Sequence, residues 1–144
     1  MTIGKKIFSS SIVVLFVFSL FPAVAAYAAN VADTPFSYNV DYNKTADTMT
    51  RAKTDRSKVY VKCTKNTGTA YVQANGSQKG TTYVSGTKYP LGIGTQYLTN
   101  NVWEKRPATN VTAYAYLRFS NPNYAKNINT TGYWSPDNSS GIGL

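Results

Sequence analysis

The chain has 144 residues, enough for one ordinary domain, and its 15 Lys and Arg residues against 6 Asp and Glu residues give a formal charge of +9. It contains no His and a single Cys. It therefore has no imidazole to act as general base or metal ligand, and no thiol pair for an intramolecular disulfide. From this we predict no catalytic residues, no metal site and no cofactor.

Charged residues make up only 15% of the chain, and 12 residues are Tyr. This composition, rich also in Thr, Asn, Ser and Gly, is typical of a β-rich extracellular protein.

Residues 1–28 have the features of a secretory signal peptide. Two lysines, Lys5 and Lys6, precede an apolar stretch that is shorter than the ~20 residues of a membrane-spanning helix. Small residues predict cleavage after Ala28, with Ala25 as a competing site. We therefore expect a secreted, extracellular domain over residues 29–144, whose formal charge falls from +9 to +7 when the two lysines are removed.

Apolar and polar residues alternate with a period of two along the rest of the chain, whereas helical periodicity is missing. The first such segment, residues 36–42, places Phe36, Tyr38, Val40 and Tyr42 on one face. The further predicted strands, in chain order, are residues 59–64, 70–74, 81–84, 97–103, 111–120 and 132–134.

Turn signals separate these strands, and Asn75-Gly76 is the strongest of them. Residues 43–57 contain almost no apolar side chains and predict a mobile basic loop, and residues 137–144 predict a frayed tail. The pattern indicates an all-β fold, an antiparallel β-sandwich of about six or seven short strands or a small barrel, in a single domain.

Three short motifs resemble a known family. Ala32-Asp33-Thr34-Pro35-Phe36-Ser37-Tyr38, Val84-Ser85-Gly86-Thr87 and Gly132-Tyr133-Trp134 are similar, in this order, to the landmarks of a family of small secreted Gram-positive proteins catalogued as a domain of unknown function. The chain departs from that family at Arg56-Ser57-Lys58, where Pro-Trp is common, and at Ser135-Pro136-Asp137, where an acidic pair is common.

The resemblance implies an association with genes for lactococcin-type bacteriocins and their transport or immunity proteins. The lactococcin type is a small, cationic, secreted β-sandwich that acts at the cell wall on the lipid precursor of peptidoglycan. The resemblance therefore implies a bacteriocin-like or envelope-directed role, and it carries no functional residue over to this chain.

A basic stretch is the sharpest charge asymmetry in the chain, with six cations against Asp55: Arg51, Lys53, Arg56, Lys58, Lys62 and Lys65. For an exported protein, the abundant polyanions are wall polymers and lipid headgroups, and each cation near an anionic membrane contributes about 1 kcal/mol. We expect these residues to bind an anionic cell-wall polymer, a lipid headgroup or a peptidoglycan precursor, and no nucleic acid. An ordinary solvated loop is the equally weighted alternative.

Several tyrosines fall on strand faces that we assign outward, and with one arginine they form a predicted aromatic contact face: Tyr60, Tyr71, Tyr114, Tyr116 and Arg118. A Tyr side chain has an apolar body and a polar tip, so such a face can stack on sugar rings and hydrogen-bond their hydroxyls. The alternative is that Tyr simply suits a pleated surface.

The remaining reactive side chains favour structural roles. Cys63 alternates with apolar neighbours, which predicts a buried position, and Trp103 and Trp134 are predicted to anchor the core or an edge. The carboxylates are scattered, and nothing in the sequence argues that Asp41 and Glu104 converge as a catalytic pair.

These features lead to a ranked set of functions. The first is a secreted, cationic, non-enzymatic protein that acts at the bacterial envelope, in a bacteriocin-like role or in competition between cells. A wall- or carbohydrate-binding accessory module and an extracellular structural protein are the alternatives, and an enzyme comes last.

Overall fold

The computed structural model describes residues 30–78, 82–123 and 126–139, so the predicted signal peptide lies outside the described residues. Within these described residues, ten strands form two antiparallel sheets, which confirms the predicted all-β sandwich, although the sequence predicts only about six or seven strands. No described residue belongs to a helix, and accordingly none belongs to a helix long and apolar enough to cross a membrane.

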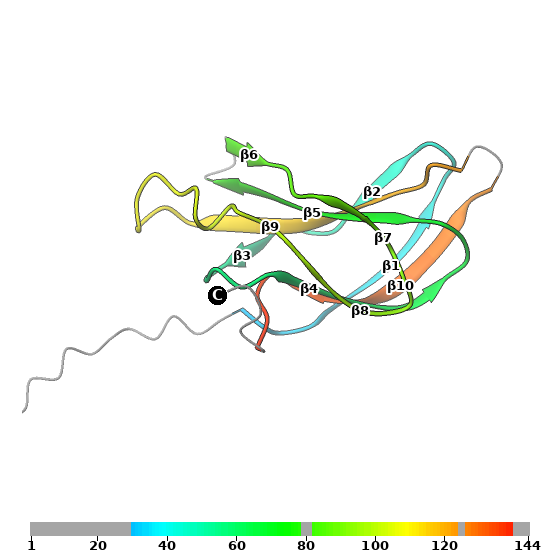
Figure 1. Ribbon diagram of the computed structural model, residues 1–144, viewed down its shortest axis with the longest axis horizontal. Coiled ribbons are helices and arrows are strands. Elements are labelled where there is room, and N and C mark those ends of the chain that lie inside the picture. The colour runs from blue at the N-terminus through cyan, green and yellow to red at the C-terminus, as the bar shows by residue number, and fades with distance from the viewer. Residues whose placement is uncertain (1–29, 79–81, 124–125, 140–144) are drawn as a thin grey trace, which may run out of the picture.

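The first sheet, here called sheet A, has the strand order β1-β10-β4-β8 and lies in the lower part of Figure 1. Its central pair joins β10 to β4, and β1 and β8 form its edges. The bounds of its strands are β1 Thr34–Val40, β4 Val59–Asn66, β8 Gly94–Leu98 and β10 Ile128–Ser135.

The second sheet, sheet B, is built around the long pair β5 and β9. The short strands β2 and β3 both pair with β9, and β6 and β7 both pair with β5. The bounds are β2 Thr45–Asp47, β3 Arg51–Lys53, β5 Tyr71–Gln78, β6 Thr82–Val84, β7 Lys88–Pro90 and β9 Ala113–Ser120. The yellow loop at the left of Figure 1 joins β8 to β9 and extends beyond the sheets.

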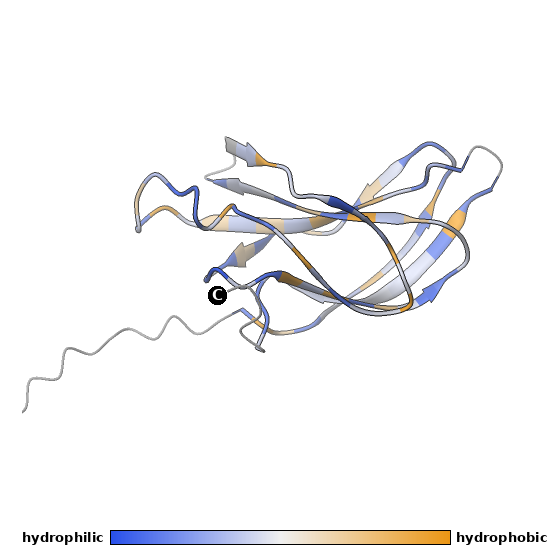
Figure 2. Ribbon diagram, in the orientation of Figure 1, coloured by the Kyte–Doolittle hydropathy of each residue, from blue (hydrophilic) through white to orange (hydrophobic). Residues whose placement is uncertain are grey.

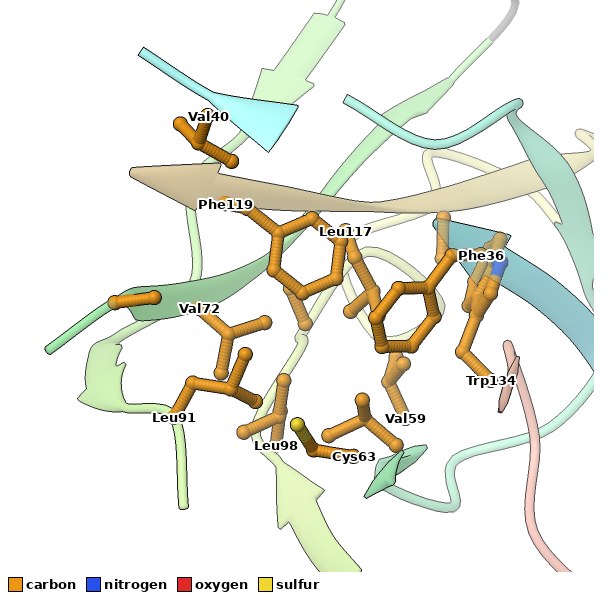
Figure 3. Packing of buried hydrophobic residues seen from close by; sticks show 14 of the residues in the cluster. Phe36, Val40, Val59, Cys63, Val72, Leu91, Leu98, Leu117, Phe119 and Trp134 are labelled. Carbon is orange, nitrogen blue, oxygen red and sulfur yellow. The ribbon is translucent and has the colours of Figure 1, made fainter. Parts of the chain in front are cut away.

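One hydrophobic core fills the space between the sheets, because every second side chain points inward. Figure 2 shows the matching alternation of hydrophobic and hydrophilic positions along the strands. In Figure 3, Leu117 and Phe119 of sheet B lie against residues of sheet A, and the rings of Phe36 and Phe119 have centroids 4.7 Å apart. Cys63 and Trp134 belong to this core and are each 1% exposed, which confirms the predicted burial of Cys63.

The predicted face of the first strand is confirmed for Phe36 and Val40 but is wrong for Tyr42, which is 57% exposed. The strand ends at Val40, and residues 42 and 43 form a turn in which Asn43 has a φ of 52°. Because the alternation stops with the strand, Tyr42 no longer points to the core.

The predicted turn at Asn75-Gly76 is wrong, because both residues lie inside β5, opposite Tyr116 and Ala115 of β9. Tertiary packing explains the glycine: a Cβ atom at Gly76 would lie 2.7 Å from the Tyr114 carbonyl oxygen and 2.7 Å from Val102 Cβ. The position therefore selects glycine for close approach within a strand, and the turn propensity of Asn-Gly is overridden.

The predicted loop over residues 43–57 contains β2 and β3, both of which add to the edge of β9. Their few apolar residues made them unrecognisable as strands, since each contributes only three residues to the sheet. Thr48 lies between them. Its hydroxyl oxygen accepts the Leu117 N–H at 2.9 Å and its own N–H donates to the Leu117 carbonyl oxygen at 2.9 Å, so it keeps the edge attached to β9.

Candidate functional site

The predicted aromatic contact face is divided between the two outer surfaces of the sandwich. Tyr114, Tyr116 and Arg118 alternate with the buried residues of β9, so they share the outer face of sheet B. Tyr71 lies on the same face, where it pairs opposite Ser120, under the Lys88 ammonium group. Tyr60 lies on β4, so it faces outward from sheet A, on the opposite surface of the sandwich. The prediction of one common face is therefore wrong for Tyr60.

A groove of about 550 Å³ lies on the outer face of sheet B. Three tyrosines and the Asp47–Arg118 pair give it its chemical character, and the full lining comprises Asp47, Thr48, Thr50, Ser77, Tyr83, Tyr114, Tyr116 and Arg118. We call this set of residues the β9 groove. The β-sheet register accounts for its depth, because the small Ser77 pairs between Tyr83 on β6 and Tyr114 on β9.

A salt bridge lies within the β9 groove. Arg118 donates from Nε to Asp47 Oδ1 at 2.8 Å and from Nη2 to Asp47 Oδ2 at 2.6 Å, a two-point contact across the β2–β9 pairing. The hydrogen bonding to Asp47 raises the pKa of Arg118 above its usual range. The guanidinium carbon also lies 5.8 Å from the centre of the Tyr116 ring. The pair fixes Arg118 beside Tyr116 and leaves the groove without net charge.

Five of the eight groove residues are not predicted from the sequence, and Tyr83 and Asp47 are the two of them that contribute an aromatic ring or a charge. Tyr83 is 73% exposed, and it comes from the weakly predicted segment that forms β6. Asp47 comes from β2, inside the segment predicted as a loop. The pairing of β2 with β9 places Asp47 opposite Arg118, and this pairing cannot be recognised from the sequence.

Two of the six predicted envelope-binding cations point into the molecule. Arg51 and Lys53 pair with Ala115 and Ala113, both buried residues of β9, so the strand geometry turns both side chains toward sheet A. Arg51 lies 5.6 Å from the Trp134 ring and donates to the Asn30 side-chain oxygen at 2.6 Å. The prediction is therefore wrong for Lys53, which is 1% exposed and out of reach of an envelope polyanion, whereas Arg51 is half-buried and its envelope contact stays a prediction.

Lys53 forms a buried salt bridge with Asp137 at 3.1 Å, and both side chains are 0% exposed. Its ammonium group also donates to the carbonyl oxygens of Ser57 and Pro136. Asp137 in turn accepts hydrogen bonds from the Thr54 N–H at 3.0 Å and from the Asn30 N–H at 2.8 Å. This network, the Lys53–Asp137 clasp, ties three distant parts of the chain together.

The prediction of a frayed tail over residues 137–144 is wrong for the first residues of that segment. Asp137 and Asn138 are buried, while residues 140–144 lie outside the described residues. Burial alone would raise the pKa of Asp137, but the hydrogen bonds from Thr54 and the charge of Lys53 outweigh it and lower that pKa. Asp137 is thus held as a carboxylate for a structural reason.

The other four predicted cations remain at the surface but do not form one loop. Lys62 and Lys65 are exposed on β4 of sheet A, with Lys58 partly exposed just before this strand. Arg56 is exposed at the end of the molecule, where it lines a small hollow with Trp103 and Arg106. The four cations are therefore available to a polyanion from two directions.

The carboxylates Asp41 and Glu104 do not converge. Asp41 lies near the last residue of β9, because Lys44 bonds both Asp41 and Asn121 through its backbone. Glu104 lies in the loop before β9 begins. Eight residues of extended strand separate these two ends, and among the described residues no three His, Cys, Asp or Glu side chains gather where a metal ion could bind.

Trp103 and Trp134 have the anchoring positions that the sequence predicts. Trp134 is in the main core, and Trp103 packs beside a second small cluster of Val84, Val102 and Ala113. The Arg106 guanidinium stacks on Trp103 at 3.2 Å from the ring centre. The packing of Trp103 on this cluster holds the long loop before β9 against sheet B, and Arg106 covers the Trp103 ring within the loop.

Comparison with known proteins identifies a family but no function. The family described as "Protein of unknown function (DUF2712)" matches residues 23–138, most of the chain. The chain belongs to this family. No curated protein and no solved structure matches the chain significantly. As a member of DUF2712, the protein has to be interpreted from its own surfaces.

Proposed function

We propose that this chain is an exported, non-enzymatic protein that binds a glycan of the bacterial envelope in the β9 groove. The observation that carries the proposal is the composition of that groove, in which three Tyr side chains surround a hydrogen-bonded Asp47–Arg118 pair. Tyr rings offer apolar faces for the C–H faces of sugar rings, and the ion pair and Thr hydroxyls offer donors and acceptors for sugar hydroxyls.

The charge balance of the groove favours a glycan over a free anion. Arg118 is paired with Asp47, so an incoming phosphate or carboxylate gains no unpaired cation. A sugar hydroxyl both donates and accepts, and therefore suits a site that presents both members of an ion pair. The groove is also partly open, as an extended polymer requires: Tyr83 is 73% exposed.

The surface cations supply a second, weaker contribution. Arg56, Lys58, Lys62 and Lys65 are at least partly exposed, so they attract the protein to anionic wall polymers or lipid headgroups. This attraction is long-range and is screened by salt, whereas stacking in the groove is not. We assign adsorption to the cations and recognition to the groove.

A non-enzymatic role is supported by how the carboxylates are used. Asp47 and Asp137 are held in ion pairs, and the Asp55 carboxylate accepts the Ser57 N–H at 2.8 Å. Binding without bond breaking serves both a bacteriocin-like protein and an accessory module. We propose competition between cells as the purpose, on the strength of the family resemblance, and inhibition of related strains by the purified protein is its test; binding without inhibition would assign the accessory role.

Replacing Tyr116 by Ala tests the groove. We expect binding to purified peptidoglycan, measured by pull-down at 0.5 M NaCl, to weaken by about tenfold or more, as for loss of a central aromatic contact. Tyr71→Ala is the matched control, because Tyr71 lies on the same sheet face outside the groove. Equal binding by both variants and the unchanged protein would refute the proposal.

A companion variant tests the cations separately. Arg56, Lys58, Lys62 and Lys65 are replaced together by Gln, and binding to intact walls that carry anionic polymers is measured at low salt. The proposal expects weaker binding at low salt and little change at high salt. Unchanged binding at low salt would remove the cations from the proposal and leave the groove in place.

A further inference from the structure

A second row of polar and aromatic side chains crosses the outer face of sheet A, on the opposite side of the sandwich from the β9 groove. Ser135 on β10 pairs with Tyr60 on β4, and Tyr60 pairs with Tyr97 on β8. Asp33 directly precedes Thr34, the partner of Trp134, so it continues the row beside Ser135. The row therefore reads Asp33, Ser135, Tyr60, Tyr97 across four strands.

The row forms one side of a hollow of about 420 Å³. The hollow lies where the small Ser135 separates two larger neighbours, and its lining comprises Val31, Asp33, Tyr60, Tyr97, Ser135, Asn138 and Ser139. With strands about 4.8 Å apart, Asp33 and Tyr60 stand roughly 10 Å from each other, which leaves room for one pyranose ring above Ser135. We call this hollow the β4 hollow.

The aromatic wall of the hollow is a tilted pair of tyrosines. The rings of Tyr60 and Tyr97 have centroids 6.0 Å apart and an angle of 56° between their planes, and both side chains are half-buried. Both residues line the hollow. Across it, the exposed Asp33 carboxylate takes part in neither of the two salt bridges of the described residues.

The charges around the hollow select among ligand classes. Asp33 disfavours a phosphate or carboxylate in the hollow. A cationic ligand is disfavoured by Lys62, which lies two residues from Tyr60 on the same strand face, and by Arg51, whose guanidinium donates at 2.6 Å to the carbonyl oxygen of Ala32, the residue before Asp33. A neutral saccharide meets neither repulsion, stacks on the tyrosines and donates its hydroxyls to Asp33.

We infer that the β4 hollow is a second saccharide site, and that the chain therefore carries two glycan sites on opposite faces. Because sheets in a sandwich pack about 10 Å apart and outward side chains add to this distance, one short oligosaccharide cannot occupy both sites. Two sites facing opposite directions instead let a single molecule bridge two glycan strands, with the gain in avidity that bivalent binding brings. The bridging part of this inference rests on the proposed function of the β9 groove; the second site does not.

Titration with N-acetylglucosamine tetramers, followed by calorimetry and by NMR shifts of the full chain, tests the inference. The unchanged protein is expected to bind two tetramers. Tyr97→Ala and Asp33→Asn are expected to remove or weaken one site by about tenfold and to leave the shifts around Tyr116 intact. Asp33→Asn alters an exposed side chain only, so its result stands if Tyr97→Ala does not fold. Tyr42→Ala, an exposed tyrosine outside both sites, is the matched control.

The variants separate the two proposals. If Tyr97→Ala and Asp33→Asn bind as the unchanged protein does while Tyr116→Ala loses its site, the second site is refuted and the groove stands. If Tyr116→Ala alone has no effect, the groove is refuted, the second site stands and bridging is refuted. Clumping of peptidoglycan fragments, measured by turbidity, is expected only when both sites are intact; clumping by either single-site variant would refute bridging, and no binding by the unchanged protein would refute both sites.

Discussion

Replacing Lys53 by Met tests whether the Lys53–Asp137 clasp, rather than envelope contact, is the role of this lysine. Met keeps most of the apolar length of the side chain but removes the ammonium group. The variant leaves Asp137 buried without its counter-charge, and it leaves the carbonyl oxygens of Ser57 and Pro136 without this donor. Removing one partner of a fully buried ion pair costs about 3–5 kcal/mol. For a domain of this size, that corresponds to a fall in Tm of roughly 10–20 °C.

Thermal unfolding followed by circular dichroism at pH 7 measures this effect. Lys65→Met is the matched control, because Lys65 is an exposed lysine of β4, and its substitution is expected to change the free energy of unfolding by no more than about 0.5 kcal/mol. If the two variants melt within about 2 °C of each other, the buried pair does not stabilise the fold as argued.

The pH dependence of thermal stability tests the same ion pair independently. The pKa of Asp137 is lowered in the folded protein, so its ionised form stabilises the fold above the unfolded-state pKa of about 3.9. That stabilisation is lost as the pH falls through the lower, folded-state pKa. In Lys53→Met the counter-charge is missing, so the difference in Tm between this variant and the unchanged protein is expected to narrow on acidification from pH 5 to pH 2. A difference that stays constant would contradict the assigned ion pair.

Two further predictions concern packing. A Cβ atom at Gly132 would lie 2.1 Å from the Lys62 carbonyl oxygen, whereas one at Gly92 would meet nothing within 4 Å. In urea unfolding, Gly132→Ala is expected to lower the free energy of unfolding by about 2–3 kcal/mol and Gly92→Ala by less than about 0.5 kcal/mol. Similar losses in the two variants would show that the β10–β4 contact accommodates a methyl group more easily than described. Cys63 is 1% exposed and donates its thiol to the Lys65 carbonyl oxygen at 3.2 Å, so a thiol-specific dye is expected to react with it only as fast as the protein unfolds. A reaction equally fast in buffer and in urea would place the thiol at the surface.

The parts of the fold that the sequence predicts well are those in which local pattern and tertiary environment agree. In β9 the apolar residues alternate over the whole strand, and both the strand and its inward face are confirmed. Asn75-Gly76 is the opposite case, because a local turn preference competes with eight paired positions between β5 and β9. Pairing and the approach of Val102 outweigh the turn, and neither is visible in a single segment of sequence.

The basic stretch shows a different limit. Arg51-Ala52-Lys53 alternates charged and apolar residues, which suggests that the charges face solvent. In the structure the alternation is reversed, because the charged residues face the interior at the end of the sandwich and Ala52 pairs with the outward Tyr114. The reversal depends on Asp137, more than eighty residues away, and on three backbone and side-chain donors that converge on it. No pattern within residues 51–65 contains that information.

The candidate sites are also predictable only where a regular strand pattern sets the direction of the side chains. The outward face of β9 is set by the period of the strand, so Tyr114, Tyr116 and Arg118 are predictable as a group. Which sheet a strand joins is not set by its period, and for this reason the sequence pattern alone groups Tyr60 with residues on the opposite surface. The strand that contributes Asp47, β2, carries too few residues for any period to be recognised, and the segment that contributes Tyr83 is predicted as a strand without its pairing to β5.

Strand pairing also explains why hollows form on a sheet face, which is otherwise flat. In the β9 groove, Ser77 stands in register between Tyr83 and Tyr114, and in the β4 hollow, Ser135 pairs beside Tyr60. Neighbouring strands place paired side chains about 5 Å apart, so a serine next to a tyrosine leaves a depression with one aromatic wall. Both depressions are therefore consequences of register, and each combines an aromatic wall with an acidic side chain, Asp47 in one and Asp33 in the other. The recurrence of this combination on two sheets with different partners is the strongest physical reason to assign the same ligand class to both.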